Sequence, residues 1–375
     1  MREWTEELAV GRAYHPAVAV LGRFVGVELS TRELAAAIET DARLVPAFYA
    51  QRPPPSPQTE GPLLVLQADG KGVPILRPAV AATARLGKGE KAGGKKEAIL
   101  TGLYTIAPAV RTPEAVVASL FKQPSAGLPA PPTPRSGPQH KRLYATLTGK
   151  TAAVAEVAGQ VSQRDGPHIT GRIALTDGCL ALQQRVQVQF PQFTLVLDCI
   201  HMLEYLWKAA NALLGERHPQ RTAWVRARAL QVLSGQGATV SAECVQLAKA
   251  PKRSRRQTTV LQQVAAYLER NLPYMQYDQY LAQGWPIATG VIEGACRHLV
   301  KDRCELSGMR WTIDGAESLL ALRCVHENGD WDAFHAFRRQ HRHQHRYHTP
   351  FPAPAAPLEC RVSALSVEQP LGCAA

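Results

Sequence analysis

Two acidic residues of the chain each follow a short apolar run and precede a glycine. Asp69 ends the run "PLLVLQAD" (62–69), and Asp177 lies near the end of "RIALTDG" (172–178). An Asp-Gly pair is an ordinary turn dipeptide, so each acid taken alone is most simply a turn residue. Taken together, the runs indicate buried strands with an acid at the carboxyl end, the edge where open α/β sheets build their sites. Carboxylates in that position suit Mg²⁺ or Mn²⁺ and two-metal phosphoryl transfer.

A third carboxylate lies in a basic segment, "GVIEGACRHLVKDR" (290–303), whose pattern predicts a helix. Glu293, Arg297 and Lys301 follow one another at a spacing of four. This row lies beside a stripe that we expect to face the core, formed by Ile292, Ala295, Cys296 and Leu299. The simplest interpretation is that Glu293 complements the helix dipole and pairs with Arg297. The alternative is that Glu293 binds a metal ion while the cations hold the phosphates of a substrate.

A further strand-end acid leaves the second metal ligand undecided. The run "FTLVLDCIH" (193–201) carries Asp198, with His201 three residues later. An Asp-x-x-His sequence is compatible with a metal site, but it also occurs as a helix cap or a simple hydrogen bond. From the residues alone, Asp177 and Asp198 are both candidates for the same ligand position.

Composition bounds the class of protein. The 375 residues include 43 lysines and arginines against 31 acids, a formal net charge of +12 that favours a polyanionic partner such as nucleic acid. The 8 cysteines form no C-x-x-C pair, so we expect reduced thiols rather than a zinc ribbon or a disulfide framework. The N-terminus carries acids where a signal peptide needs an apolar stretch, and no apolar run approaches the length of a membrane span. These features predict a soluble intracellular protein.

Proline-rich stretches divide the chain into segments. We expect strands at 62–69, 172–178 and 193–201, one or two more within 95–108, and helices at 112–121 and 144–163. The pattern between residues 202 and 285 is almost wholly helical. This order predicts an α/β fold with a mixed sheet flanked by helices and an all-α insertion before the last helices. The expected segments are an N-terminal helical region (1–55), the first part of the core (60–201) with a Pro-rich loop (122–141), the helical insertion (202–285), the last core helices (286–345) and a disordered tail (346–375).

Four of these stretches together resemble the ISKra-type transposases of bacterial insertion sequences, a branch of the DDE transposases related to Mutator-like elements. They are "LQADGKGVPI", "KKEAILTGLYTIAP", "ALTDG…FPQFTLVLDCIHMLEYLWKAA" and "MQYDQYLAQGWPIATGVIEGACRHLVKDRCELSGMRWTIDGAESLLALR". The resemblance covers about residues 20 to 340, in the family's order, and is most specific from Tyr277 to Trp311. Members usually carry an N-terminal DNA-recognition region, so we expect residues 1–55 to be a shortened form of it.

The resemblance implies an RNase H-like core with a DDE triad. It implies Asp69, Asp177 and Glu293 as the catalytic residues and ligands of two Mg²⁺ or Mn²⁺ ions, with Asp198 and His201 as accessory residues. In the hallmark "SGMRW" segment, Arg310 and Trp311 are expected to bind DNA by phosphate contact and base stacking, although Trp311 is equally expected as a core anchor. The other residues expected at DNA are Lys71, Arg297, Lys301 and Arg303.

The expected activity is metal-dependent strand cleavage and strand transfer at the ends of an insertion sequence. The expected partner is double-stranded DNA, bound by a homodimer without membrane association in the bacterial cytoplasm at the nucleoid. The basic runs 252–256 and 338–348 are further DNA-contact candidates, against the simpler interpretation of solvated surface. Two alternatives remain: an RNase H-like nuclease without strand transfer, and an inactive, truncated DNA-binding remnant.

Overall fold

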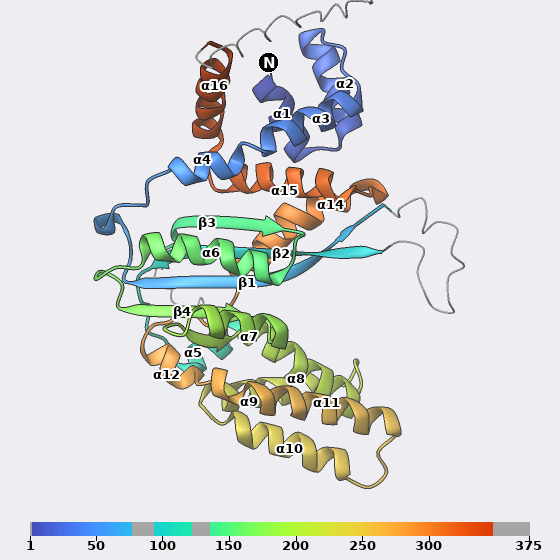
Figure 1. Ribbon diagram of the computed structural model, residues 1–375. Helices are drawn as coiled ribbons and strands as arrows, with labels where there is room; N and C mark the ends of the chain where they lie inside the picture. The colour runs from blue at the N-terminus through green and yellow to red at the C-terminus, as the bar shows by residue number, and fades with distance from the viewer. Residues whose placement is uncertain (1, 77–93, 122–135, 348–375) are drawn as a thin grey trace, which may run out of the picture.

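The sheet at the centre of the protein is assembled from segments far apart in the chain. The computed structural model describes residues 2–76, 94–121 and 136–347 (Figure 1). Its strands are β1 (Leu63–Pro74), β2 (Lys95–Ile106), β3 (Gln139–Thr146), β4 (Gly171–Thr176) and β5 (Thr194–Leu197). The helices up to β5 are α1 (Arg2–Gly11), α2 (Tyr14–Val25), α3 (Thr31–Ala42), α4 (Val45–Gln51), α5 (Pro113–Leu120), α6 (Lys150–Arg164) and α7 (Leu180–Gln189). Those after β5 are α8 (Cys199–Leu214), α9 (Arg221–Leu233), α10 (Gly237–Lys249), α11 (Arg255–Asn271), α12 (Tyr277–Ala282), α13 (Gly290–Ala295), α14 (Asp302–Cys304), α15 (Ile313–Glu327) and α16 (Trp331–Tyr347).

The strands are ordered β3-β2-β1-β4-β5. Strands β1, β2 and β3 form an antiparallel meander, while β4 runs parallel to β1 and β5 runs parallel to β4. The predicted fold class is confirmed: the sheet is mixed, it is flanked by helices in the RNase H-like manner, and an all-α insertion precedes the last helices. Because β1, β4 and β5 are parallel, their carboxyl ends meet at one edge of the sheet.

Both faces of the sheet are covered, as the alternation of side chains along β1 requires. Leu64 and Leu66 pack with α6 and α7 on one face. Leu63 and Val65 face the other way and join the core that β4 and β5 share with the insertion helices. A third cluster joins β2 and β3 to α15 and to the N-terminal helices. Figure 1 shows the result: α8–α11 lie at one end of the molecule, α1–α4 with α15 and α16 lie at the other, and the sheet lies between them.

On the antiparallel side of the sheet, one prediction is confirmed and another was wrong. Of the one or two strands expected within 95–108, the segment forms one, β2, paired with β1 along twelve residues. The segment 139–146, expected to end the Pro-rich loop and begin a helix, is the third strand. Its local pattern is weak, because only its last residues are buried, and it is pairing with β2 that makes it a strand. Most of the Pro-rich loop, residues 122–135, lies outside the described residues.

Strand β3 lies at the edge of the sheet, yet its outer backbone groups are paired. The side chain of Asn328, just beyond α15, accepts a hydrogen bond from Leu143 N (2.7 Å) and donates one to Leu143 O (3.0 Å). Directly after β3, Leu147 N donates to the carboxylate of Glu317 on α15 (2.6 Å). Side chains of the α15 segment thus replace a neighbouring strand, which protects the edge from pairing with another chain.

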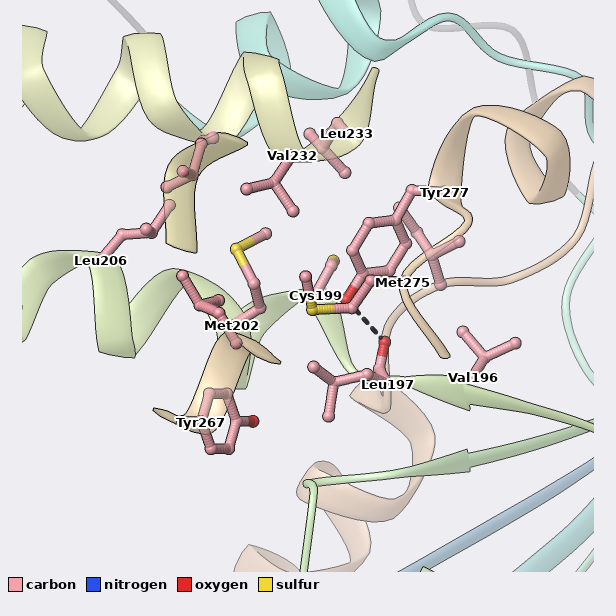
Figure 2. Packing of buried hydrophobic residues seen from close by; sticks show 14 of the residues in the cluster. Val196, Leu197, Cys199, Met202, Leu206, Val232, Leu233, Tyr267, Met275 and Tyr277 are labelled. Carbon is pink, nitrogen blue, oxygen red and sulfur yellow. Dashed lines mark hydrogen bonds between the residues drawn. The ribbon is translucent and has the colours of Figure 1, made fainter. Parts of the chain in front are cut away.

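The insertion α8–α12 packs against the end of β5. Figure 2 shows Met202 and Leu206 of α8 together with Val232 and Leu233 of α9, beside Leu197 at the end of β5. The hydroxyl of Tyr277, which is fully buried, donates to Leu197 O (2.9 Å). The insertion is therefore continuous with the core at the edge where the parallel strands end.

The last helix packs against the first helices. Arg338 on α16 is buried and pairs with Glu6 of α1 and Asp41 of α3. Arg339 and Arg342 pair with acids of the same two helices, so three arginines of the basic run 338–348 take part in packing, and α16 extends to Tyr347. The predicted tail, apart from its first two residues, lies outside the described residues. None of the helices within the described ranges has the length and apolar character needed to cross a membrane.

Candidate active site

Three acids occupy equivalent positions on three neighbouring strands. The parallel pairing of β1 and β4 ends at Ala68 and Thr176, and each is followed directly by one of the predicted catalytic acids, Asp69 and Asp177. The pairing of β4 with β5 ends at Thr176 and Leu197, and Asp198 follows. Strand β1 itself continues beyond Asp69 in its pairing with β2, so Asp69 ends the parallel part of the strand rather than the strand. The register alone places the acids in a row at one edge.

The carboxylate of Asp69 accepts two hydrogen bonds, and its surroundings disfavour its negative charge. Its Oδ1 accepts a hydrogen bond from Gly70 N (2.6 Å), and the thiol of Cys296 donates to its Oδ2 (3.3 Å). Burial raises the pKa of Asp69, and the negative charge of Asp177 raises it further, while His201 acts in the opposite direction. Among the described residues, neither Asp69 nor Asp177 has an ion-pair partner. A cation between the two carboxylates would relieve this repulsion.

Asp177 is oriented by a tight turn. Its Oδ1 accepts a hydrogen bond from Cys179 N (2.9 Å), and Gly178 between them has a φ of 89°, in the left-handed region. An aspartate side chain that accepts from the backbone two residues on forms an Asx-turn. The turn that the Asp-Gly pair predicts is therefore present, and it coexists with the strand-end position that a metal ligand needs.

Glu293 is fixed by contacts that sequence reasoning missed. The helix that carries it, α13, has only six residues. Gln67, fully buried on β1, accepts from the backbone of that helix at Ile292 N (3.0 Å), and Asp198 accepts from Thr289 N (2.8 Å). The hydroxyl of Thr289 then donates to Glu293 Oε1 (3.0 Å). The available signal was Gln67 itself, a polar residue within an apolar strand two positions before the first acid.

The pair Asp198 and His201 forms a hydrogen-bonded unit beside Glu293. Asp198 is fully buried and caps α8, and its Oδ2 accepts from both His201 N (2.9 Å) and His201 Nδ1 (2.6 Å). The hydrogen bond to Asp198 raises the pKa of His201 to about 9, although burial acts in the opposite direction. His201 Nδ1 lies 3.9 Å from Glu293 Oε1. With Nδ1 held by Asp198 and the ring protonated at neutral pH, Nε2–H can donate a hydrogen bond to an anionic substrate.

Two donor sets for a metal ion share Glu293. Potential ligand atoms of Asp198, His201 and Glu293 all lie within 4.8 Å of one another, and they form the only such group in the parts of the chain that the structure describes. In this set, however, Asp198 already accepts three hydrogen bonds, so it is better suited to orient His201 than to bind metal. The predicted set Asp69, Asp177 and Glu293 is more open, because its ligand atoms do not all lie within 4.8 Å of one another, but it offers carboxylate oxygens only and includes the two acids without ion-pair partners among the described residues. The donor chemistry of this second set fits a hard divalent cation.

The basic side chains predicted to contact DNA differ in their exposure. Arg297 and Lys301 follow Glu293 and are exposed, Arg310 is exposed, and Lys71 is half-buried on β1 two residues after Asp69. The expected pairing of Glu293 with Arg297 is absent from the ion pairs of the described residues, since Arg297 Nε instead lies 3.7 Å from Asp302. The reason is local geometry: residues Cys296–Lys301 form a π-helical segment, which breaks the spacing of four.

The expectation that Arg303 and Trp311 contact DNA is corrected. Arg303 is fully buried, donates two hydrogen bonds to Ala9 O (3.1 and 3.0 Å), and lies over the rings of Tyr14 and Trp311. Trp311 is 5% exposed and donates from its indole to Cys304 O (3.0 Å). Both side chains therefore anchor the N-terminal helices to the core, and neither presents a surface to a phosphate or a base.

The core stripe predicted beside Glu293 is confirmed, since Ile292, Ala295, Cys296 and Leu299 are all buried.

Comparisons with known proteins identify no family: no family model matches the chain, and no curated protein matches it.

Proposed function

We propose that this protein is a DDE transposase of the ISKra type, which cleaves and joins DNA strands by metal-dependent phosphoryl transfer. The observation that carries the proposal is the common register of Asp69 and Asp177 at the end of the parallel pairing, with Glu293 tied to the same strand through Gln67. Two carboxylates from adjacent strands and one from a helix make a site for oxygen-preferring divalent cations.

The proposed ligands of two Mg²⁺ or Mn²⁺ ions are Asp69, Asp177 and Glu293. When bound, the ions supply activation of the attacking oxygen and stabilisation of the leaving oxygen. The chain's own part is to hold the carboxylates: Gly70 and Cys296 fix Asp69, and Thr289 fixes Glu293.

The basic residues that remain accessible have a separate role. We assign Lys71, Arg297, Lys301 and Arg310 to the phosphates of double-stranded DNA, because their side chains are at least partly exposed. Lys71 follows Asp69 closely in sequence, and Arg297 and Lys301 follow Glu293. His201, oriented by Asp198, places a ring nitrogen beside Glu293 and is assigned to orienting the substrate. Two copies acting on two DNA ends at the nucleoid complete the proposal.

The test is joining of DNA ends. Labelled fragments carrying the DNA on either side of the coding sequence would be incubated with purified protein, Mn²⁺ and a supercoiled plasmid. We expect labelled plasmid with wild type and at least about 100-fold less with Asp177→Asn. Asp332→Asn, which alters an exposed aspartate on α16, is the matched control and should join at the wild-type rate.

Two results would contradict the proposal in different ways. Cleavage of the fragments without any joining would identify a nuclease with the same core. DNA binding without cleavage, unchanged in Asp177→Asn, would identify a DNA-binding remnant.

A further inference from the structure

Two side chains of the insertion hold the backbone of the turn that carries Asp177. The hydroxyl of Tyr267 on α11 donates to Asp177 O (3.0 Å), and Arg270 Nη2, one turn later, donates to Gly178 O (2.9 Å). Both carbonyl groups lie just beyond β4, after its pairing with β1 and β5 has ended at Thr176. Without α11, these two acceptors would be left to water.

The turn and Tyr267 are in direct contact. A Cβ atom added at Gly178 would lie 2.9 Å from Tyr267 Oη, so the glycine is required both for its left-handed backbone and for the close approach of the tyrosine. The Tyr267 ring stacks on Tyr205 of α8, with centroids 3.5 Å apart and planes 3° apart. Helix α8 is the one that Asp198 caps and that carries His201.

Further contacts make α11 a rigid support. Asn271 at the end of α11 donates to Tyr267 O (2.8 Å) and accepts from Gln183 of α7 (2.9 Å), the helix that follows the Asp177 turn. Tyr277, after α11, donates to Leu197 O, as Figure 2 shows. Three backbone carbonyls at the acid-bearing edge are thus bound by side chains that belong to the insertion.

We infer that Tyr267 and Arg270 are positioning residues for Asp177, so that the all-α insertion sets the geometry of the metal site. The inference rests on the proposed function, because it concerns the ligand role of Asp177. Among the described residues, the Asp177 side chain has one hydrogen bond, to the backbone of its own turn, so the direction of its carboxylate follows the position of that turn. The turn in turn is located by the two donors of α11. Loss of an outer partner of a metal ligand typically weakens metal binding about tenfold or more.

The experiment compares two tyrosines of one stack in the full-length protein. Tyr267→Phe removes only the hydroxyl that holds Asp177 O, and Tyr205→Phe makes the same change on a hydroxyl for which the described residues offer no hydrogen-bond partner. Mn²⁺ binding is measured by calorimetry, together with thermal unfolding and Mn²⁺-dependent DNA cleavage. Arg270→Lys is the second variant, which keeps the charge but shortens the reach.

We expect Mn²⁺ affinity about tenfold weaker in Tyr267→Phe, wild-type affinity in Tyr205→Phe, and cleavage by Tyr267→Phe that recovers at saturating Mn²⁺. A merely structural role would lower the unfolding temperature without this rescue by metal. Equal Mn²⁺ affinity in Tyr267→Phe, Arg270→Lys and wild type would overturn the inference while leaving the proposed function standing. Wild-type protein that binds no Mn²⁺, or binds it equally well as Asp177→Asn, would overturn the proposed function and the inference with it.

Discussion

Gln67 and Gln160 are two buried glutamines whose replacement by leucine should have opposite consequences. Gln67 is fully buried on β1, where it donates to Tyr104 Oη (2.9 Å) and to Ala288 O (3.3 Å) and accepts from Ile292 N (3.0 Å). Gln160 on α6 is 4% exposed, and neither its amide nitrogen nor its amide oxygen has a partner among the described residues.

The expected magnitudes follow from these contacts. Gln67→Leu leaves two buried polar groups and one partly buried carbonyl unpaired, at about 1 kcal/mol each, so the free energy of unfolding should fall by about 3 kcal/mol. Gln160→Leu removes no hydrogen bond and takes two unpaired polar atoms out of the interior, so stability should stay within about 0.5 kcal/mol of wild type or rise. Leucine is close to glutamine in size, which keeps cavity effects small in both variants.

Urea denaturation followed by tryptophan fluorescence measures both variants, with Mn²⁺ calorimetry on the folded protein as a second readout. Gln67→Leu should also weaken Mn²⁺ binding, because the amide ties the Glu293 helix to the strand of Asp69. Equal losses of stability in the two variants would refute the reasoning, since it depends on the hydrogen bonds and not on burial alone.

Four further predictions concern packing, DNA binding, pH and the sheet edge. Arg303→Met should lower the free energy of unfolding by about 2 kcal/mol or more without changing the DNA affinity of the folded fraction, because the guanidinium is buried against two rings. Lys301 is exposed, so Lys301→Ala should weaken DNA binding measured by fluorescence anisotropy at low salt and should change the free energy of unfolding by less than about 0.5 kcal/mol. Burial raises the pKa of Glu6 to about 8. Below pH 8 the folded state therefore keeps a proton that the unfolded chain releases at the usual pKa of a glutamate, and the folded state loses stability as pH rises toward 8. Burial also lowers the pKa of His335 to about 4, which offsets the Glu6 effect below about pH 6.5. The free energy of unfolding measured with urea should therefore fall by about 2 kcal/mol between pH 6.5 and 8, and Glu6→Gln should flatten the fall. Asn328→Ala should expose the β3 edge, lowering stability by about 2 kcal/mol and increasing self-association in light scattering, and unchanged behaviour would mean that another group covers the edge.

The acid-bearing strands were predictable because local pattern and topology agree. Strands β1, β4 and β5 are short apolar runs with an acid at the end of the parallel pairing, and parallel strands necessarily bring those ends together. The core stripe on the helix of Glu293 was predictable for the same reason, since buried side chains follow the helical period.

The errors arose where distant contacts decide the structure. Strand β3 has little apolar character of its own and is formed by pairing with β2 and by Asn328. Arg303 has the charge of a DNA-contacting residue, but its partner Ala9 lies 294 positions earlier, on a helix whose placement the pattern does not reveal. Gln67 likewise meets the Glu293 helix 225 positions later. A local sequence pattern does not indicate which residues meet across such distances in the chain.

The choice between Asp177 and Asp198 as metal ligand is the central claim, and calorimetric Mn²⁺ titration of wild type, Asp177→Asn and Asp198→Asn tests it most directly. Asparagine keeps the size of each side chain and an oxygen acceptor for Cys179 N or Thr289 N. We predict that Asp177→Asn abolishes measurable binding, whereas Asp198→Asn binds Mn²⁺ about tenfold more weakly than wild type because His201 loses its orientation. Abolished binding in Asp198→Asn with wild-type binding in Asp177→Asn would contradict the account and place the metal on Asp198, His201 and Glu293.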